Sequence, residues 1–120
     1  MNRAAMRGIL LGMWLIWVCP TSAEEKLEFN RDVRPILSNA CFHCHGPDEK
    51  KRKSGLRFDL AEAPFKPAKS GEPAIIKGNA EKSELTYRIF LPDGDDDHMP
   101  PIDSGKSLTK EQKGILRTCI

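Results

Sequence analysis

Apolar residues recur at helical spacing along the stretch from residue 27 to residue 40. Apolar positions three or four residues apart line up on one face of a helix. Here that face consists of Phe29, Val33, Ile36, Leu37 and Ala40. We therefore predict a first helix over residues 27–40. Asp32 is the predicted N-cap, because Pro35 would then lie in the first turn, where a missing N–H costs little.

Two further helices are expected nearer the C-terminus. Residues 80–90 carry an apolar side that includes Leu85 and Ile89, and the proline and glycine that follow would stop the helix. Thr109 is followed three residues later by Gln112, which is typical of a capping box at a helix start. The sequence therefore predicts a last helix that begins at Thr109.

The chain between the first two helices is predicted to be mostly loop. Residues 48–53 are all charged, which indicates a solvated surface, although the basic run at residues 50–53 can also attract an acidic partner. Residues 55–60 alternate apolar and other side chains, which indicates a short extended segment. Proline and glycine occur too densely in residues 61–79 for a helix. Ile75 and Ile76 form an apolar pair there that we expect to pack inward.

The segment directly after the first helix carries the chemistry. Residues 41–45 read Cys-Phe-His-Cys-His, and two cysteines three positions apart with a histidine after the second form the attachment signal for c-type haem. One helical turn of about 3.6 residues brings Cys41, Cys44 and His45 to one side. From there the two thiols can reach the two vinyl groups of a porphyrin, and an imidazole nitrogen can reach the iron. The pattern predicts covalent haem with His45 as its proximal ligand.

Other kinds of site use the same pair of cysteines. Cys41 and Cys44 can form half of a zinc site completed by histidines, a thioredoxin-like redox pair, or a plain disulfide. A zinc-stabilised exported binding module is the main alternative function. The histidine after the pair, the N-terminal leader and the Met-Pro-Pro run at residues 99–101 favour haem. His43, inside the motif, is expected to be exposed and not a ligand.

The N-terminus has the features of a secretory signal peptide. Arg3 and Arg7 precede an apolar stretch over residues 8–18, which is short for a membrane span of about 20 residues. Small residues precede Glu24, as a cleavage site requires. We predict that residues 1–23 are removed, which leaves no membrane anchor. The expected location is the periplasm or an equivalent extracytoplasmic compartment, and an uncleaved anchor is the main alternative.

Removing the leader changes the charge of the chain. The full sequence has 19 basic and 17 acidic residues. The leader holds two basic residues and no acidic one, so the mature chain has 17 of each and a formal net charge of zero. This balance gives no indication of nucleic-acid binding. The sequence also shows no nucleophile–base pair or paired carboxylates, so we do not expect a substrate-converting enzyme.

The mature chain over residues 24–120 is long enough for one domain and too short for two. Small domains bury a smaller fraction of their surface, so a haem would supply much of the missing core. With Cys41 and Cys44 bound to haem, Cys119 has no partner within the mature chain, and an odd exported thiol can pair between molecules. We therefore expect some adventitious disulfide dimer through Cys119.

Five runs of residues occur in an order typical of one protein family. They are Phe-Asn-Arg-Asp-Val-Arg-Pro-Ile-Leu at 29–37, Cys-Phe-His-Cys-His-Gly-Pro-Asp at 41–48, Lys-Ser-Gly-Leu-Arg-Phe-Asp at 53–59, Ser-Glu-Leu at 83–85 and Met-Pro-Pro at 99–101. With these runs the chain resembles the cytochrome c domain of planctomycete bacteria, which is similar to class I c-type cytochromes. The resemblance extends over nearly all of residues 28–117.

The resemblance implies a small, all-α, cytochrome c-like fold. In such a fold a few helices and long loops wrap around one covalent haem c, and the first and last helices cross. Cys41 and Cys44 match the thioether positions. His45 matches the proximal ligand of the haem iron, and Met99 matches the distal ligand. The implied function is one-electron transfer by Fe(II)/Fe(III) cycling, with a redox partner protein that the sequence does not identify.

Met99 and His98 compete for the distal position. Neighbouring side chains of an extended segment point to opposite faces, so only one of the two would face the haem. Pro100 biases Met99 toward extended backbone, and acidic residues at 95–97 precede His98. We predict that Met99 binds the iron and that His98 lies on the solvent side. His45 should donate its other ring nitrogen to a backbone carbonyl.

Two features depart from the family pattern. The last helix of the family usually carries a tryptophan near its end, where this chain has Cys119. The family domain is also commonly the front module of a larger secreted protein, whereas this sequence stops at Ile120. We therefore expect residues 24–120 to be either a C-terminally truncated domain or such a front module.

Overall fold

The computed structural model describes residues 25–120, and the predicted signal peptide over residues 1–23 lies outside them. Three α-helices and four short helical segments of other types make up the regular structure of this part, which contains no β-strand. Pro67 and Pro73 pair there in an isolated bridge. This architecture agrees with the predicted all-α class. None of the described helices is long and apolar enough to span a bilayer.

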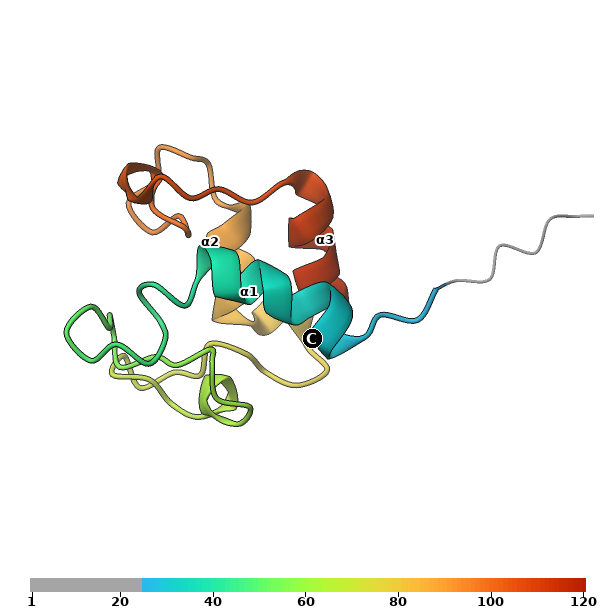
Figure 1. Ribbon diagram of the computed structural model, residues 1–120, viewed down its shortest axis with the longest axis horizontal. Coiled ribbons are helices and arrows are strands. Elements are labelled where there is room, and N and C mark those ends of the chain that lie inside the picture. The colour runs from blue at the N-terminus through green and yellow to red at the C-terminus, as the bar shows by residue number, and fades with distance from the viewer. Residues whose placement is uncertain (1–24) are drawn as a thin grey trace, which may run out of the picture.

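The predicted first helix is present, and it begins as a π-helix. Phe29–Val33 form the π-helix η1, and Arg34–Ala40 continue it as the α-helix α1 (Figure 1). The expectation that Pro35 lies in the first turn is confirmed, since it occupies one of the first two positions of α1. The apolar face is largely as predicted, although Phe29 is 50% exposed.

The prediction of Asp32 as N-cap is wrong, because Asp32 lies inside the π-helix. Its carboxylate accepts a hydrogen bond from the N–H of Glu28, at 2.7 Å. Val33 stands at the N-cap position of α1 and makes no side-chain cap. The π-helix already supplies carbonyl oxygens to the start of α1, as the bond from the Arg34 N–H to the Phe29 carbonyl shows. A capping side chain is therefore not needed.

The second and third helices are found where the pattern predicts them. The 3₁₀-helix η3 (Ala80–Lys82) leads into α2 (Glu84–Phe90), and α3 spans Lys110–Thr118. The predicted capping box of α3 is confirmed. The Thr109 hydroxyl accepts from the N–H of Gln112 at 3.1 Å, and the Gln112 side chain accepts from the N–H of Thr109 at 2.9 Å.

The connections are loops with two more short 3₁₀-helices, η2 (Ala63–Phe65) and η4 (Ile102–Ser104). The predicted extended segment over residues 55–60 is absent, and that stretch consists of turns with an exposed Leu60. Ile75 packs against the core as predicted, whereas Ile76 is 38% exposed. Figure 1 shows the loop after α1 and the loop before α3 extending to the same side of the helices.

The apolar core is small and lies between the helices and the first loop. Its buried members are Val33, Ile36, Leu37, Phe58, Ala74, Leu85, Ile89 and Leu116. Helix α3 packs against α2 and also contacts η1, so the first and last helical segments meet, as the resemblance implies. The C-terminus accordingly lies beside the start of the first helical stretch (Figure 1). Cys41 and Phe42 pack against this core, which places the motif at its edge.

Candidate functional site

The motif at residues 41–45 forms one turn at the end of α1. The N–H of His45 donates to the carbonyl of Cys41 at 2.8 Å, and the N–H of Cys44 donates to the same carbonyl at 3.2 Å. The N–H of Cys41 itself still bonds to the carbonyl of Leu37 in α1, at 2.8 Å. The helix therefore leads directly into the motif, and the predicted single turn is present.

Both cysteines of the motif are free thiols of intermediate burial. Burial, together with the neighbouring Cys44, raises the pKa of the Cys41 thiol to about 12. A redox-active Cys-x-x-Cys pair needs the opposite, a lowered pKa that yields a nucleophilic thiolate. The raised pKa of Cys41 thus does not favour the thioredoxin-like alternative, and the two thiols are not joined in a disulfide here.

His45 is oriented by a backbone carbonyl, as predicted. Its Nδ1 lies 3.3 Å from the carbonyl oxygen of Lys53. A carbonyl can only accept, so Nδ1 carries the proton and Nε2 keeps a free lone pair. Burial lowers the pKa of His45, the bond to Lys53 opposes this effect, and the charge of Arg88 adds to it. The imidazole is therefore held neutral, which is the form that binds a metal.

The loop after the motif folds back and holds the His45 ring in place. The N–H of Lys53 donates to the carbonyl of Cys44 at 2.7 Å, and the N–H of Phe58 donates to the carbonyl of His45 at 2.8 Å. The chain reverses between these two bonds at Gly55, whose φ of 66° is easily reached by a residue without Cβ. The Phe58 ring then meets the imidazole edge to face, with centroids 5.9 Å apart.

Two residues outside the sequence-based predictions fix the turn that follows His45. Arg52 donates from Nε to the carbonyl of Gly46 and from Nη2 to the carbonyl of Pro47, both at 2.9 Å. The charged run at 48–53 is therefore not solvated throughout. A Cβ at Gly46 would overlap the carbonyl oxygen of Phe42, so this position requires glycine. The signal in the sequence was the Gly-Pro pair directly after the motif.

Met99 lies on the loop between α2 and α3 and is half-buried. Its N–H donates to the carbonyl of Arg88 in α2, at 3.1 Å. Among the described residues, no hydrogen bond joins Met99 directly to the motif. Burial is the main cause of the lowered pKa of His45, and the charge of Arg88 contributes to it.

The prediction that His98 lies on the solvent side is wrong, because this residue is only 7% exposed. The prediction assumed an extended segment, in which neighbouring side chains alternate. The segment instead consists of turns, with the N–H of Asp95 bonded to the carbonyl of Pro92 and the N–H of His98 bonded to the carbonyl of Asp95. Alternation does not apply in turns, so both His98 and Met99 can be covered.

Three buried polar atoms in this region have no hydrogen-bond partner. They are Oγ1 of Thr86 in α2 and both ring nitrogens of His98. Nε2 of His98 lies 3.6 Å from Oδ1 of Asp93, beyond hydrogen-bond distance. Buried polar atoms are nearly always satisfied in native proteins, so these three stand out as unsatisfied. Two free thiols, an imidazole with a free nitrogen and a thioether are a donor set that fits haem c.

The described residues offer no comparable set of ligands for a zinc ion. His43 is exposed, as predicted. Across residues 25–120, no group of three or more His, Cys, Asp or Glu side chains lies close enough together to hold a metal ion. Structural zinc sites need four ligands around one ion. The cysteine pair therefore has no histidines in position to complete a zinc site in this part of the chain.

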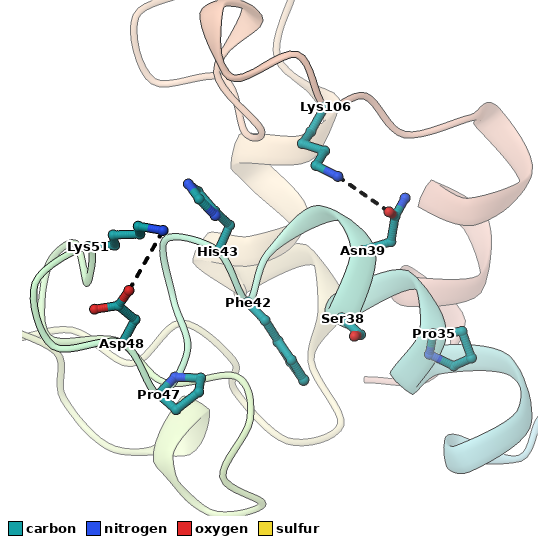
Figure 2. A pocket seen from close by; sticks show the side chains of 9 residues that line it. All are labelled: Pro35, Ser38, Asn39, Phe42, His43, Pro47, Asp48, Lys51 and Lys106. Atoms are coloured by element: carbon teal, nitrogen blue, oxygen red, sulfur yellow. Dashed lines mark hydrogen bonds and ion pairs between the residues drawn. The ribbon is translucent and has the colours of Figure 1, made fainter.

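A groove lies beside the motif, next to Phe42 and His43, the two residues between its cysteines. Its lining residues are Pro35, Ser38, Asn39, Phe42, His43, Pro47, Asp48, Lys51 and Lys106. Figure 2 shows the Phe42 ring among these side chains and Lys106 reaching toward Asn39. Cys41, Cys44 and His45 are not among its lining residues.

Comparisons with known proteins give one match. A family model described as planctomycete cytochrome C matches residues 41–103, from the first cysteine of the motif to beyond Met99. No curated protein and no solved structure matches the chain. The matched segment makes up more than half of the 120 residues and includes the motif, the loop that holds His45, and helix α2. The chain therefore belongs to the planctomycete cytochrome C family.

Proposed function

We propose that this protein is an exported c-type cytochrome module that carries one covalent haem c and transfers single electrons. The observation that carries the proposal is the motif turn, where two free thiols and an imidazole with a free Nε2 come from five consecutive residues. Membership of the family supports an electron carrier over a substrate-converting enzyme. When bound, the haem supplies Fe(II)/Fe(III) cycling.

The residues of the chain bind and orient the cofactor in this proposal. Cys41 and Cys44 would hold the haem through two thioether bonds. His45 presents Nε2, and the Lys53 carbonyl fixes its tautomer and ring plane. The Phe58 ring packs against the imidazole and limits its rotation. This support would keep the imidazole in one orientation.

Met99 is the proposed distal ligand. It matches the family's distal position in the Met-Pro-Pro run, it is half-buried, and its backbone is tied to α2 through Arg88. His98 is the rival, since it is buried and its ring nitrogens are unpartnered. The match to the family's Met-Pro-Pro run favours the thioether, so we assign the iron to Met99 and keep His98 as the comparison in the test.

Export follows from the same chemistry. Covalent haem attachment belongs to extracytoplasmic compartments, and residues 1–23 have the pattern of a signal peptide. Residues 24–120 then form the working domain in the periplasm or its equivalent. Its partner is a redox protein, because a single haem that carries one electron needs a donor and an acceptor.

The test is expression in a host with a cytochrome c maturation system. The exported protein should absorb strongly in the visible range and should stain for haem peroxidase activity after denaturing electrophoresis. Cys41→Ala and Cys44→Ala should each weaken the stain, and the double variant should abolish it. Cys119→Ala is the matched control and should stain as the wild type does. A folded, colourless product that contains zinc would overturn the proposal.

A further inference from the structure

Arg88 holds the Met99 loop with both its side chain and its backbone. Its guanidinium donates from Nε to Oε1 of Glu84 at 2.8 Å and from Nη1 to Oδ1 of Asp97 at 2.9 Å. A longer bond, of 3.4 Å, joins Nη1 to the carbonyl of Asp97. The carbonyl of Arg88 accepts the N–H of Met99 at 3.1 Å. One residue thus fixes the loop on both sides of position 98.

Helix α2 gives this clamp a firm base. Leu85 and Ile89 are buried in the core, so the helix cannot shift without breaking apolar packing. Glu84 lies one turn before Arg88 and directs its guanidinium. Partial burial opposes the charge on Arg88, but the hydrogen bonds to Asp97 and Glu84 raise its pKa above the ordinary value. Its side chain is 31% exposed, so its ion pairs are partly shielded from water and salt.

We propose that Arg88 is a positioning residue, whose ion pair with Asp97 holds the loop so that the Met99 thioether stays on the iron. This inference rests on the proposed function and on Met99 as the distal ligand. Without the ion pair, only backbone groups of the loop remain bonded to Arg88, and Met99 leaves the iron more often. An added ligand that must displace Met99 then binds more tightly. The side chain of Arg88 touches no reacting atom in this scheme.

The experiment measures the affinity of oxidised, haem-loaded protein for imidazole. Arg88→Gln and Asp97→Asn each remove the ion pair and should raise the affinity about fivefold, the order expected for a partly exposed pair. Arg88→Lys keeps the positive charge but cannot bond to Glu84 and Asp97 in the same geometry. Its affinity for imidazole should therefore lie between those of the wild type and Arg88→Gln. The double variant Arg88→Gln/Asp97→Asn should exceed neither single variant, because both remove the same interaction.

Arg117→Gln is the matched control. It removes an ion pair between Arg117 of α3 and Glu81 of η3, which does not touch the Met99 loop. Its imidazole affinity should equal that of the wild type. If the effect came only from a loss of stability, Arg117→Gln would raise the imidazole affinity as much as Arg88→Gln does. An unchanged affinity in both Arg88→Gln and Asp97→Asn, or an equal rise in Arg117→Gln, would overturn the inference.

The failure of the proposed function would be visible earlier, in the wild type and in Met99→Ala. A wild type without haem, or an absorption band of the sulfur–iron bond that survives in Met99→Ala, overturns the ligand assignment and this inference with it. A band that is lost in Met99→Ala, with unchanged imidazole affinity in the ion-pair variants, overturns the inference alone. If Arg88→Gln yields no folded protein, Asp97→Asn decides the matter, since that side chain is 60% exposed.

Discussion

His45 owes its binding capacity to neighbours that contribute mostly backbone atoms. The carbonyl of Lys53 selects the tautomer, and the carbonyl of Gly46 anchors Arg52 over the following turn. Such contacts depend on how the loop returns to the motif and not on the side chain of Lys53. The sequence could therefore predict that a carbonyl bonds to His45, but it could not identify which one.

Gly46→Ala is expected to destabilise the protein. The added Cβ would overlap the carbonyl oxygen of Phe42, and the main chain cannot move away without disturbing the bond from Arg52. Overpacking of this kind costs about 1–3 kcal/mol in the free energy of unfolding. Denaturant unfolding of the haem-loaded protein measures it.

Gly114→Ala is the matched control for this prediction. Gly114 lies in α3, and a Cβ there would meet nothing within 4 Å. Alanine should stabilise a helix interior by about 0.5–1 kcal/mol relative to glycine. The two substitutions are thus expected to have opposite signs. A neutral Gly46→Ala would mean that the turn after the motif is not closely packed.

Met99→Ala is expected to remove the weak sulfur-to-iron absorption near the red end of the visible spectrum of the oxidised protein. It should also lower the reduction potential, because ligation by methionine and histidine raises it. His98→Ala should keep the band. His98 is 7% exposed, so its truncation can cost stability, and the intensity of the main haem absorption checks that the protein is folded. Loss of the band in His98→Ala alone would reverse the assignment.

Helical periodicity predicted α1 and α2, and the capping box predicted α3, whereas the other helix ends depended on contacts that the pattern does not reveal. The start of α3 was predictable because the capping box is local, with Thr109 and Gln112 three residues apart. The start of α1 was not, because nothing in the apolar spacing marks the wider turn of η1 and its effect on Asp32. Caps are predictable where side chains alone provide them.

The loops show the same limit. Density of proline and glycine correctly predicted that residues 61–79 form no long helix. Alternation wrongly predicted an extended segment at residues 55–60 and a solvent-facing His98, because both stretches form turns whose bonds join backbone atoms. The proximal side of the site therefore followed from a local motif. The surroundings of Met99 could not be predicted in the same way, because they depend on how the loop after α2 packs against that helix.

Thr109→Ala is expected to lower the free energy of unfolding by about 1 kcal/mol, the usual loss for a removed N-cap. Helix α3 packs against α2 and contacts η1, so fraying of its first turn should be felt in global unfolding. Ser107→Ala is the control, since Ser107 is exposed and its side chain makes no hydrogen bond in the described part of the chain. Equal losses in the two variants would show that the cap contributes nothing.

For the molecule as a whole, the apolar core of the described residues is small. Eight residues make up the buried apolar cluster of the described chain. They lie in the helical segments, apart from Phe58 and Ala74, which lie in the loop between α1 and α2. Small domains bury a low fraction of their surface and often need a cofactor or cross-link to be stable. We therefore expect protein without haem to be poorly folded, which its far-ultraviolet circular dichroism would report.

Cys119 is expected to link two molecules when the purified protein is concentrated. Its side chain is an exposed free thiol at the end of α3. Partial burial, together with the charge of Asp32, raises the pKa of this thiol. Because the thiolate is the reactive form, the disulfide dimer should form faster at alkaline pH than at neutral pH. Non-reducing gels follow this, and a protein that stays monomeric with Cys119 open to alkylation would contradict it.

The most direct test is the intact mass of the exported protein under denaturing conditions. Denaturation removes every non-covalent ligand, so only thioether bonds at Cys41 and Cys44 can keep a haem on the chain. We predict a chain that is heavier by the mass of one haem, and a Cys41→Ala/Cys44→Ala variant that has the mass of the bare polypeptide. A wild-type protein that is folded, exported by the same host and no heavier than its polypeptide would contradict the assignment of a c-type cytochrome.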